Sequence, residues 1–369
     1  MKKFISIIIA VAAATAFESC STEDLAGTHA NDRTDVPQKE MLRVYEEVKT
    51  PYKYGLVMVA ADKSKKTDCP TIFRKGGKWY MYYFVFDGRG YETWLADSRD
   101  LLHWETRGRV LSFSDNSDWD CDQKGGYISL PDLKWGGKYG FNEYEGKHWM
   151  SYFGSNTSGY EQGDLSIGVA YTDGDVTKPH EWNRLDHPVL SPKDADAKWW
   201  DNGKEYKSCI IQDRKRLTGH PFVMYYNAKG PFESIGMATS DDMVHWHRYG
   251  NDPLLQHGLN ITGDAYIQQM DKLYVMFYFG HGWNKNQDIK AWNSFACSYD
   301  LVHWTDWTGE ELIKASEPFD EHYAHKSCVV KWKGVVYHFY CSVDNQQNRG
   351  IAVATSKDLG KSTLSYPEK

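Results

Sequence analysis

The heptapeptide SRDLLHW at residues 98–104 decides the fold, because the chain repeats it. SDDMVHW occupies 240–246, SYDLVHW occupies 298–304, and a shortened copy, SKDL, occupies 356–359. The copies start at 98, 240, 298 and 356, so successive starts are 142, 58 and 58 residues apart. The first gap has room for two units, with a degenerate copy around Trp182. Five units of roughly 50–70 residues are therefore expected, a period typical of solenoids, propellers and other repeat arrays.

Each unit is expected to consist of strands. Upstream of each copy lies a short aromatic and β-branched run bounded by Gly, Asn and Asp, as is typical of strands. The runs lack clean alternation, which indicates sheets covered on both faces. A second short strand and a turn precede each run, so each unit supplies four strands and the sequence predicts an all-β, five-bladed β-propeller. The runs are 79–86, 149–153, 222–226, 274–279 and 335–340.

Two segments complete the predicted domain. The last unit ends without an outer strand, and the apolar segment 55–61 could supply it and close the ring. Residues 37–49 are expected to form a short helix before that segment. The Ser and Asp of the repeated heptapeptide can bond the backbone of a tight turn, and its Trp can pack between blades. The heptapeptide is therefore assigned to structure and not to chemistry.

Composition excludes several classes of protein. The 369 residues carry a net charge of -7, which argues against general nucleic-acid binding. The 41% share of hydrophobic residues excludes a disordered chain. Beyond residue 20 the cysteines show no CxxC pair or zinc-ligand spacing, so small buried residues are favoured over a disulfide framework. These cysteines are Cys69, Cys121, Cys209, Cys297, Cys328 and Cys341.

The N-terminus has the pattern of a targeting segment. Two lysines and an apolar run over 4–17 form a signal peptide. Cys20 follows this run and resembles a bacterial lipoprotein processing site, and the acidic stretch 21–24 resembles the export tails of Bacteroidetes lipoproteins. This implies an outer-membrane lipoprotein at the cell surface or in the periplasm, with the lipid on Cys20 as its only membrane contact. An ordinary secreted protein cut nearby is the alternative. The predicted parts are a signal peptide at 1–20, a tether at 21–36 and a catalytic propeller at 37–369.

The innermost strand of each blade lines the central channel, so the residues that start these strands are candidate site residues. Aligning the units places an ionisable or aromatic side chain at each start. Carboxylates at a channel mouth suit glycoside hydrolysis, in which one group protonates the leaving oxygen and another activates water or attacks the anomeric carbon. The aligned positions are Asp68, Asp132, Tyr206, Asp264 and His325, with Glu205 one residue out of register.

The loops joining the second and third strands of each unit are expected on the same face as these positions. Aromatic side chains there can stack on the apolar face of a sugar ring, and a few polar groups can fix its orientation. The residues predicted to contact substrate are Arg89, Tyr206, His281, Trp283 and Glu233.

From residue 68 to about residue 359 the chain resembles the five-bladed propeller glycosidases, namely glycoside hydrolase family 43 and its relatives, families 32, 117 and 130. In that group an early Asp close to a Pro is the base or nucleophile, and DCP at 68–70 matches this pattern. LPDL at 130–133 resembles the family 43 segment whose Asp tunes the acid and orients the sugar. The resemblance implies that role for Asp132.

The general acid departs from the family 43 pattern. That family has a Glu at the start of the third blade, where this chain has Tyr206, with Glu205 as the nearest carboxyl group. Family 117 is associated with a first-blade Asp, a later Asp and a His acid. Asp68, Asp264 and His325 follow that arrangement.

The resemblance implies an exo-acting, inverting hydrolase of plant or algal oligosaccharides or polysaccharides. Asp68 would deprotonate water, His325 or Glu205 would protonate the glycosidic oxygen, and Asp264 would hold sugar hydroxyls and tune the acid. With an unperturbed pKa of about 6.5, a His acid could be kept protonated by neighbouring carboxylates. No cofactor is required, and a structural divalent cation in the channel, near Asp264 or His325, is a further implication.

Two other functions fit the same residues. A non-catalytic surface glycan-binding lipoprotein would keep the aromatic side chains and use the acids as contacts. A phosphorolytic propeller of the family 130 type would need a basic cluster for phosphate. Lys207 and Lys326 directly follow aligned axial positions, so strand alternation predicts that they point away from the channel mouth. The candidate phosphate ligands are Lys207, Lys326, Arg89 and Lys229.

Overall fold

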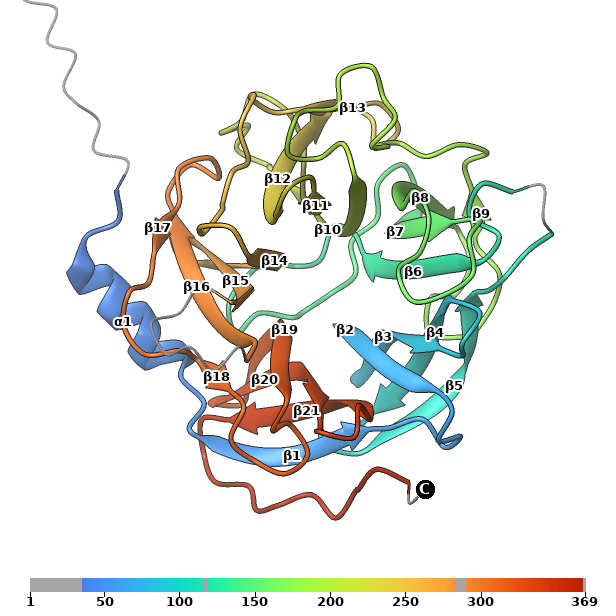
Figure 1. Cartoon of the computed structure of the whole chain (residues 1–369). Helices are drawn as coiled ribbons and strands as arrows, with labels where there is room; N and C mark the ends of the chain where they lie inside the picture. Colours follow the sequence, from blue (N-terminus) through green and yellow to red (C-terminus); the bar gives the residue numbers. More distant parts are fainter. Residues whose placement is uncertain (1–34, 116–117, 283–289, 368–369) are drawn as a thin grey trace, which may run out of the picture. The chain divides into compact units, whose positions relative to one another are not determined.

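The sheets surround a central axis (Figure 1). The computed structural model describes residues 35–115, 118–282 and 290–367, all of which belong to one compact unit. Three sheets have four strands each, and a nine-stranded sheet consists of two further sets joined by a single parallel pairing of Glu233 with Ile261. The described strands therefore group into five blades, in agreement with the all-β propeller expected from the repeat.

Successive strands of each blade pair antiparallel, from an inner strand at the axis outwards. Blade 1 consists of β2 (Lys66–Lys75), β3 (Lys78–Phe86), β4 (Tyr91–Ser98) and β5 (Trp104–Leu111). Blade 2 consists of β6 (Gln123–Ile128), β7 (His148–Ser155), β8 (Ser166–Thr172) and β9 (Asn183–Arg184). Blade 3 consists of β10 (Lys204–Gln212), β11 (Phe222–Lys229), β12 (Glu233–Ser240) and β13 (Trp246–Arg248).

The remaining two blades differ at their outer edges. Blade 4 consists of β14 (Ile261–Met270), β15 (Leu273–His281) and β16 (Trp292–Ser298), with the short β17 (Thr305–Asp306) and β18 (Ile313–Lys314) both pairing with β16. Blade 5 consists of β19 (Tyr323–Trp332), β20 (Val335–Val343) and β21 (Arg349–Thr355), and its outer strand is β1 (Tyr52–Met58).

The ring closes as the sequence predicts. Strand β1 comes from before the first blade and pairs antiparallel with β21 of the last, so the expected outer strand is confirmed a few residues earlier than 55–61. The C-terminal segment then crosses β1, where the Ser362 N–H donates to the carbonyl of Tyr54 over 2.7 Å. An edge strand covered in this way is protected from pairing with another chain.

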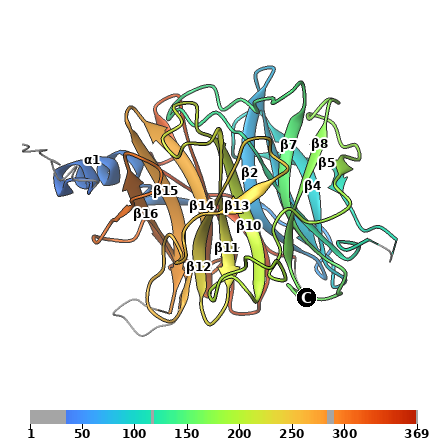
Figure 2. The same cartoon turned by 90° about the horizontal axis from the view of Figure 1, so that it is seen from above.

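The helix α1 (Gln38–Val48) confirms the helix expected at 37–49. Its start at Pro37 suits proline, whose missing N–H would have no helical partner there. Met41, Val44 and Val48 share one helix face and are buried in the same cluster as the core of blades 4 and 5. Figure 2 shows α1 at the side of the blades. Among the described residues, no helix is long and apolar enough to cross a membrane.

Strands inside the ring are covered on both faces. Every residue of β7 and of β20 is buried, as expected for blades stacked against neighbours on each side. The apolar clusters accordingly combine residues from adjacent blades, which explains why the strands lack alternation. The cysteine prediction is confirmed in this part of the chain. All six cysteines beyond residue 20 are free and buried.

The repeated heptapeptide forms the same turn each time. In its third copy, the N–H groups of Asp300 and Leu301 donate to the Ser298 hydroxyl. Asp300 in turn accepts from two further backbone N–H groups, and Leu301 has a left-handed φ of 70°. The Trp304 indole donates to the carbonyl of Leu301 over 3.2 Å. The heptapeptide therefore stabilises the connection between the third and fourth strands, as predicted.

Removing the Asp of this turn should affect stability and not catalysis. Asp300→Ala deletes the acceptor of two backbone N–H groups, and we expect a cost of about 1 kcal/mol, as for a lost helix cap. Hydrogen bonds from His303 and the backbone lower the pKa of Asp300, although partial burial opposes them. Its stabilising effect should therefore be present above about pH 4 and fade as the carboxylate is protonated. Thermal melting of both proteins at pH 7 and pH 3 measures this, and an equal difference at both pH values would contradict it.

A backbone irregularity recurs at the axis. Near the start of the inner strands of blades 1, 3, 4 and 5, the register with the second strand shifts by one residue. Each shift contains a residue with a left-handed backbone, which is the pattern of a β-bulge. A bulge breaks strict alternation, so two successive side chains can face the axis. The left-handed residues are Cys69 (φ 48°), Lys207 (φ 42°), Asp264 (φ 59°) and Lys326 (φ 65°).

Candidate active site

A cavity of about 210 Å³ lies at the starts of the inner strands. Its walls come from the inner strands β10, β14 and β19, from the end of β15, from the β7–β8 loop, and from the first residues of β12 and β21. It combines aromatic rings with carboxylates and cations, and such a mixture of apolar and polar groups is typical of small-molecule sites. The lining residues are Tyr160, Glu161, Tyr206, Lys207, Glu233, Ile261, Phe279, His281, Ala291, Tyr323, His325, Lys326 and Arg349.

A second, smaller cavity of about 40 Å³ continues along the axis. Its wall includes the bulge residues Cys69, Lys207, Asp264 and Lys326. Lys207 and Lys326 line both cavities, so the expectation that they point away from the channel mouth is wrong. The bulge is the reason, because it turns the residue after the aligned position back towards the axis.

Asp68 lies behind the cavity wall as the centre of an ion-pair cluster. It is fully buried, and its Oδ1 accepts from the Cys69 N–H and from the Cys341 thiol. Its Oδ2 accepts from Lys326 Nζ over 2.8 Å and from the Arg349 guanidinium. Burial alone would raise the pKa of Asp68, but the two cations hold it well below its usual value. Asp68 therefore anchors two cations that line the cavity, and it is not itself among the lining residues.

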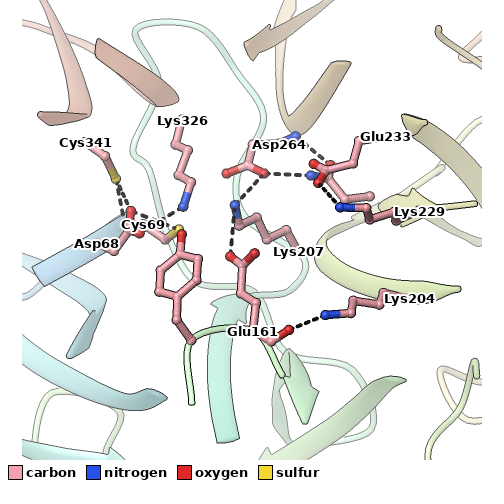
Figure 3. Close-up of polar contacts among 12 residues, drawn as sticks. Asp68, Cys69, Glu161, Lys204, Lys207, Lys229, Glu233, Asp264, Lys326 and Cys341 are labelled. Carbon is pink, nitrogen blue, oxygen red and sulfur yellow. Dashed lines mark hydrogen bonds and ion pairs between the residues drawn. The ribbon is translucent and has the colours of Figure 1, made fainter. Parts of the chain in front are cut away.

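Asp264 reaches the axis by way of its bulge. Its N–H donates to Asn227 Oδ1 over 2.6 Å, and its Oδ1 accepts from Asn227 Nδ2 over 3.0 Å. Gly263 makes this contact possible, because a Cβ there would lie 2.5 Å from the Asn227 amide. Burial raises the pKa of Asp264, and Lys207 and Lys326 oppose the rise. Figure 3 shows Lys207 between Asp264 and Glu161.

Glu233 begins β12 and enters the cavity as predicted from its loop. The buried Tyr206 phenol acts on its carboxyl group, and Lys229 Nζ lies 3.7 Å from its Oε1. Burial raises the pKa of Glu233, and the neighbouring Glu161 carboxylate raises it further. Tyr206, Lys207 and Lys229 oppose this increase without cancelling it. The arrangement favours a protonated Glu233.

Glu161 comes from the corresponding loop of the preceding blade. Its backbone is left-handed (φ 48°), and its carbonyl accepts from Lys204. The adjacent Tyr160 hydroxyl accepts from Arg349 over 3.1 Å, which ties the loop to blade 5. The Glu161 side chain is 19% exposed, and its Oε1 lies 3.9 Å from Lys207 Nζ. Glu161 is therefore a partly accessible carboxylate beside a buried cation.

His325 lines the cavity, but in a different state from the one expected. Its Nδ1 donates to the Cys341 carbonyl over 3.2 Å, which leaves Nε2 as the acceptor of a neutral ring. Burial lowers the pKa of His325 well below its usual value, and Lys326 and Arg349 lower it further. The expectation that carboxylates keep this ring protonated is wrong because the nearest cations outweigh Asp68.

Two predicted acids lie elsewhere. Asp132 borders a separate cavity together with Gln212 and Gln269, which lie at or near the far ends of β10 and β14. Its carboxylate accepts hydrogen bonds from two backbone N–H groups of its own turn. The alignment of blade 2 that placed it at the mouth is wrong, because β6 (Gln123–Ile128) ends before this residue. Blade 2 instead contributes Glu161.

Glu205 is buried on the side of β10 away from the cavity. Strand alternation turns it opposite to Tyr206, and it is paired with Arg248. Arg248 also contacts Asp201 and Asp194, so this is a cluster within blade 3. Burial raises the pKa of Glu205 to about 8, although Arg248 opposes the rise. The structure gives Glu205 no path to a substrate in the cavity.

Some of the residues predicted to contact substrate line the cavity, and others lie outside it. Tyr206, His281 and Glu233 line the cavity. Arg89 lies outside it, paired with Asp122 over 2.6 Å, and its carbonyl accepts from Gly159 of the β7–β8 loop. Trp283 and Cys20 lie outside the described residues.

Sequence reasoning missed the cavity residues Glu161 and Arg349, and it named Lys207 and Lys326 only as candidate phosphate ligands that point away from the mouth. Glu161 could have been found, because its loop joins the second and third strands, like the loop that gave Glu233. Arg349 begins the third strand of blade 5, just as Glu233 begins the third strand of blade 3. Lys207 and Lys326 could not be found by alternation, since no sequence pattern marks the bulges.

The residues at the axis do not fit the divalent cation that the family resemblance implied. Among the described residues, the group able to hold a metal ion is Asp68 with Cys69 and Cys341. The Lys326 ammonium and the Arg349 guanidinium already neutralise that carboxylate. Two thiols also match poorly with the oxygen ligands that Ca²⁺ and Mg²⁺ prefer.

Solved structures give the relationship directly. The protein is 50% identical to one named as a complex of BT0996 with RGII, over 90% of its own length and 99% of the other, with a TM-score of 0.88. It is 49% identical to one named "Glycoside hydrolase", with the same coverage and a TM-score of 0.87. A thermostable family-43 glycoside hydrolase at 14% identity shares the fold, with a TM-score of 0.57 over 84% of this protein and 98% of that one. No protein-family model and no curated protein matches. The protein therefore belongs to the glycoside hydrolases, on a propeller like that of family 43.

Proposed function

We propose that the protein is an exo-acting, inverting glycoside hydrolase, with Glu233 as the general acid and Glu161 as the general base. The observation that carries this proposal is the pair itself. Two glutamates from equivalent loops of adjacent blades line one cavity, and burial raises the pKa of Glu233. A pair of carboxyl groups, of which the acid has a raised pKa, is the pattern of acid and base in glycosidases.

Glu233 is suited to protonate the leaving oxygen. Burial raises its pKa, which favours the protonated form that a general acid needs, and the Tyr206 phenol acts on the same carboxyl group. The proton moves from Glu233 to the glycosidic oxygen as the bond from that oxygen to the anomeric carbon breaks. Lys229 then lies close to the carboxylate that forms.

Glu161 is suited to activate the water molecule that attacks the sugar. As a partly exposed carboxylate beside the Lys207 ammonium, it takes a proton from a water molecule whose oxygen attacks the anomeric carbon. The released sugar then has an inverted configuration. Retention, seen by NMR of the first product, would instead make Glu161 the nucleophile.

The size of the cavity supports an exo mode. About 210 Å³ is below the 300–1,000 Å³ typical of ligand pockets. A cavity of this size suits one terminal sugar better than the interior of a polysaccharide. We infer that the rest of the glycan lies outside the cavity.

The substrate we propose is a plant glycan, and the ligand we would test first is the RGII that the name of the 50% identical structure prints. The test is to incubate the protein with RGII oligosaccharides and with a panel of other plant and algal oligosaccharides. Release of one monosaccharide by the wild type, and not by Glu233→Gln, supports the proposal. Binding without release by either protein would favour the non-catalytic glycan-binding function.

His325 provides a separate prediction. Because the ring is neutral, His325→Gln should weaken binding of the sugar but leave both limbs of the pH–rate profile in place. The basic limb should belong to Glu233. Measuring kcat/KM from pH 4 to 9 checks this, and loss of the basic limb in the variant would restore His325 as the acid.

Phosphorolysis remains a second candidate because Lys207, Lys326 and Arg349 line the cavity. Their charges are matched by Asp68, Asp264 and Glu161, so little positive charge is left for a phosphate. Hydrolysis is therefore the preferred reaction. A rate that depends on added phosphate, with a sugar phosphate as product, would reverse this preference.

We also propose that the protein is anchored to the outer membrane through a lipid on Cys20. The support is the sequence alone, since this residue lies outside the described ones. Mass spectrometry of the mature protein should find an acylated Cys20 as its first residue. Cys20→Ser should release the protein from membranes.

A further inference from the structure

Lys207, like Lys326, is a cavity cation whose position the sequence pattern did not predict. Its ammonium is buried, with 6% of the side chain exposed, and it lines the cavity. Asp264 Oδ1 lies 3.5 Å from its Nζ, and Glu161 Oε1 lies 3.9 Å away. Both distances exceed a direct hydrogen bond of about 2.7–3.2 Å. Lys207 is therefore a shared counter-charge and not the tight partner of one acid.

The other cations near the cavity have different partners. Lys326 lies 2.8 Å from Asp68, and Arg349 is bonded to the same carboxylate. Lys229 is 51% exposed, so solvent and salt screen its effect on Glu233. Among the described residues, Lys207 is thus the buried cation that lies close to Glu161.

Three carboxylates surround this one ammonium. Glu161 and Asp264 are in contact with it, and Glu233 feels its charge. If Lys207 were neutral, Glu161 and Glu233 in the cavity and Asp264 next to it would lose the buried cation that they share, and like charges at close range favour protonation. The protonation pattern that the hydrolysis requires would then be lost.

We propose that Lys207 is the positioning residue of the base, because its buried ammonium lies beside the Glu161 carboxylate and favours the charged form of that group. This inference rests on the proposed function, because it assigns Glu161 the role of base. The groups that act on Glu161 come from several elements. They are Lys207 and Tyr206 on β10, Glu233 on β12, Asp264 on β14, Tyr91 on β4 and, through the Glu161 carbonyl, Lys204.

The β-bulge is what allows this role. A residue following Tyr206 on a regular strand would face away from the cavity, but the left-handed backbone at Lys207 turns its side chain inwards. A non-glycine residue with φ near 42° is uncommon, and such strain gathers at functional sites. The strained backbone therefore stands at the residue that supplies the buried cation, Lys207.

The test is the pH dependence of kcat/KM for Lys207→Met and Lys207→Arg on the oligosaccharide that the wild type cleaves. Methionine removes the charge with little change of length, so the acid limb should move up by about 1 pH unit or more. Lys207→Arg keeps the charge and should keep the acid limb near its wild-type position. A purely structural role would lower the rate at every pH without moving the limb.

Lys229→Met is the matched control. It also removes one lysine charge beside a cavity glutamate, but from an exposed site, and its acid limb should stay near that of the wild type. If Lys207→Met does not fold, Lys207→Gln is measured in its place. An unmoved acid limb in a folded, neutral variant would overturn the inference while leaving the proposed function intact. A wild type without hydrolytic activity would overturn both.

Discussion

Glu233→Gln and Glu161→Gln are each expected to lower kcat/KM by about 10²- to 10⁴-fold, the usual contribution of a positioned acid or base. Glutamine keeps the shape of the side chain but can neither give nor take the proton. Because the acid and base act in one transition state, the double variant should be little worse than the poorer single variant. Steady-state kinetics on the cleaved oligosaccharide measure these losses.

A substrate with an activated leaving group separates the two roles. An aryl leaving group needs little protonation, so Glu233→Gln should recover much of its rate on an aryl glycoside. Glu161→Gln should not recover, because attack by water still needs a base. Equal recovery by both variants would contradict the assignment of acid and base.

Glu205→Gln is the matched control for these substitutions. Glu205 is also a buried glutamate, one residue from Tyr206, but it is paired with Arg248 and does not line the cavity. Its variant should retain close to wild-type kcat/KM. A large loss in Glu205→Gln together with full activity in Glu233→Gln would reinstate Glu205 as the acid.

The second large effect is expected for Asp68→Asn. The substitution leaves the buried Lys326 and Arg349 without their counter-charge, and we expect a cost of about 3–5 kcal/mol, as for other broken buried ion pairs. The melting temperature should fall on the order of 10 °C. Activity should fall as well, because both cations line the cavity. Thermal melting and kinetics on the same preparation measure the two effects.

The stability measurement distinguishes an anchor from a catalytic base. A base at position 68 would predict a stable, inactive Asp68→Asn variant. Asp132→Asn is the control, since Asp132 accepts backbone hydrogen bonds in a turn far from the cavity and should cost at most about 1 kcal/mol. An Asp68→Asn protein as stable as this control would falsify the anchor.

Sequence reasoning reached the fold because the repeat is local. The hydrogen bonds that form the turn lie within the heptapeptide, as in SRDLLHW. Each full copy therefore forms the same turn wherever it occurs in the chain. The apolar runs and the missing outer strand then led to blades and to ring closure. Blade 2 was misaligned at Asp132 because its copy of the heptapeptide is degenerate.

The candidate site was only partly predictable. The loops that join second and third strands led to Glu233 and His281, and Tyr206 and His325 were found at the starts of inner strands. Their protonation states were not predictable from the sequence. Which charges face Glu233 and His325 depends on side chains from other blades.

The sequence by itself determined the repeat, the strands, the order of the blades and the face on which the site lies, because these follow from periodicity and turn chemistry. The tertiary structure decided which acids are accessible and which are neutralised. Asp68 is separated by more than 250 residues from the two cations that neutralise it. Lys207 faces the cavity only because a bulge interrupts strand alternation. Charge pairing across the ring and one-residue shifts of register are set by three-dimensional packing, and no local pattern encodes them.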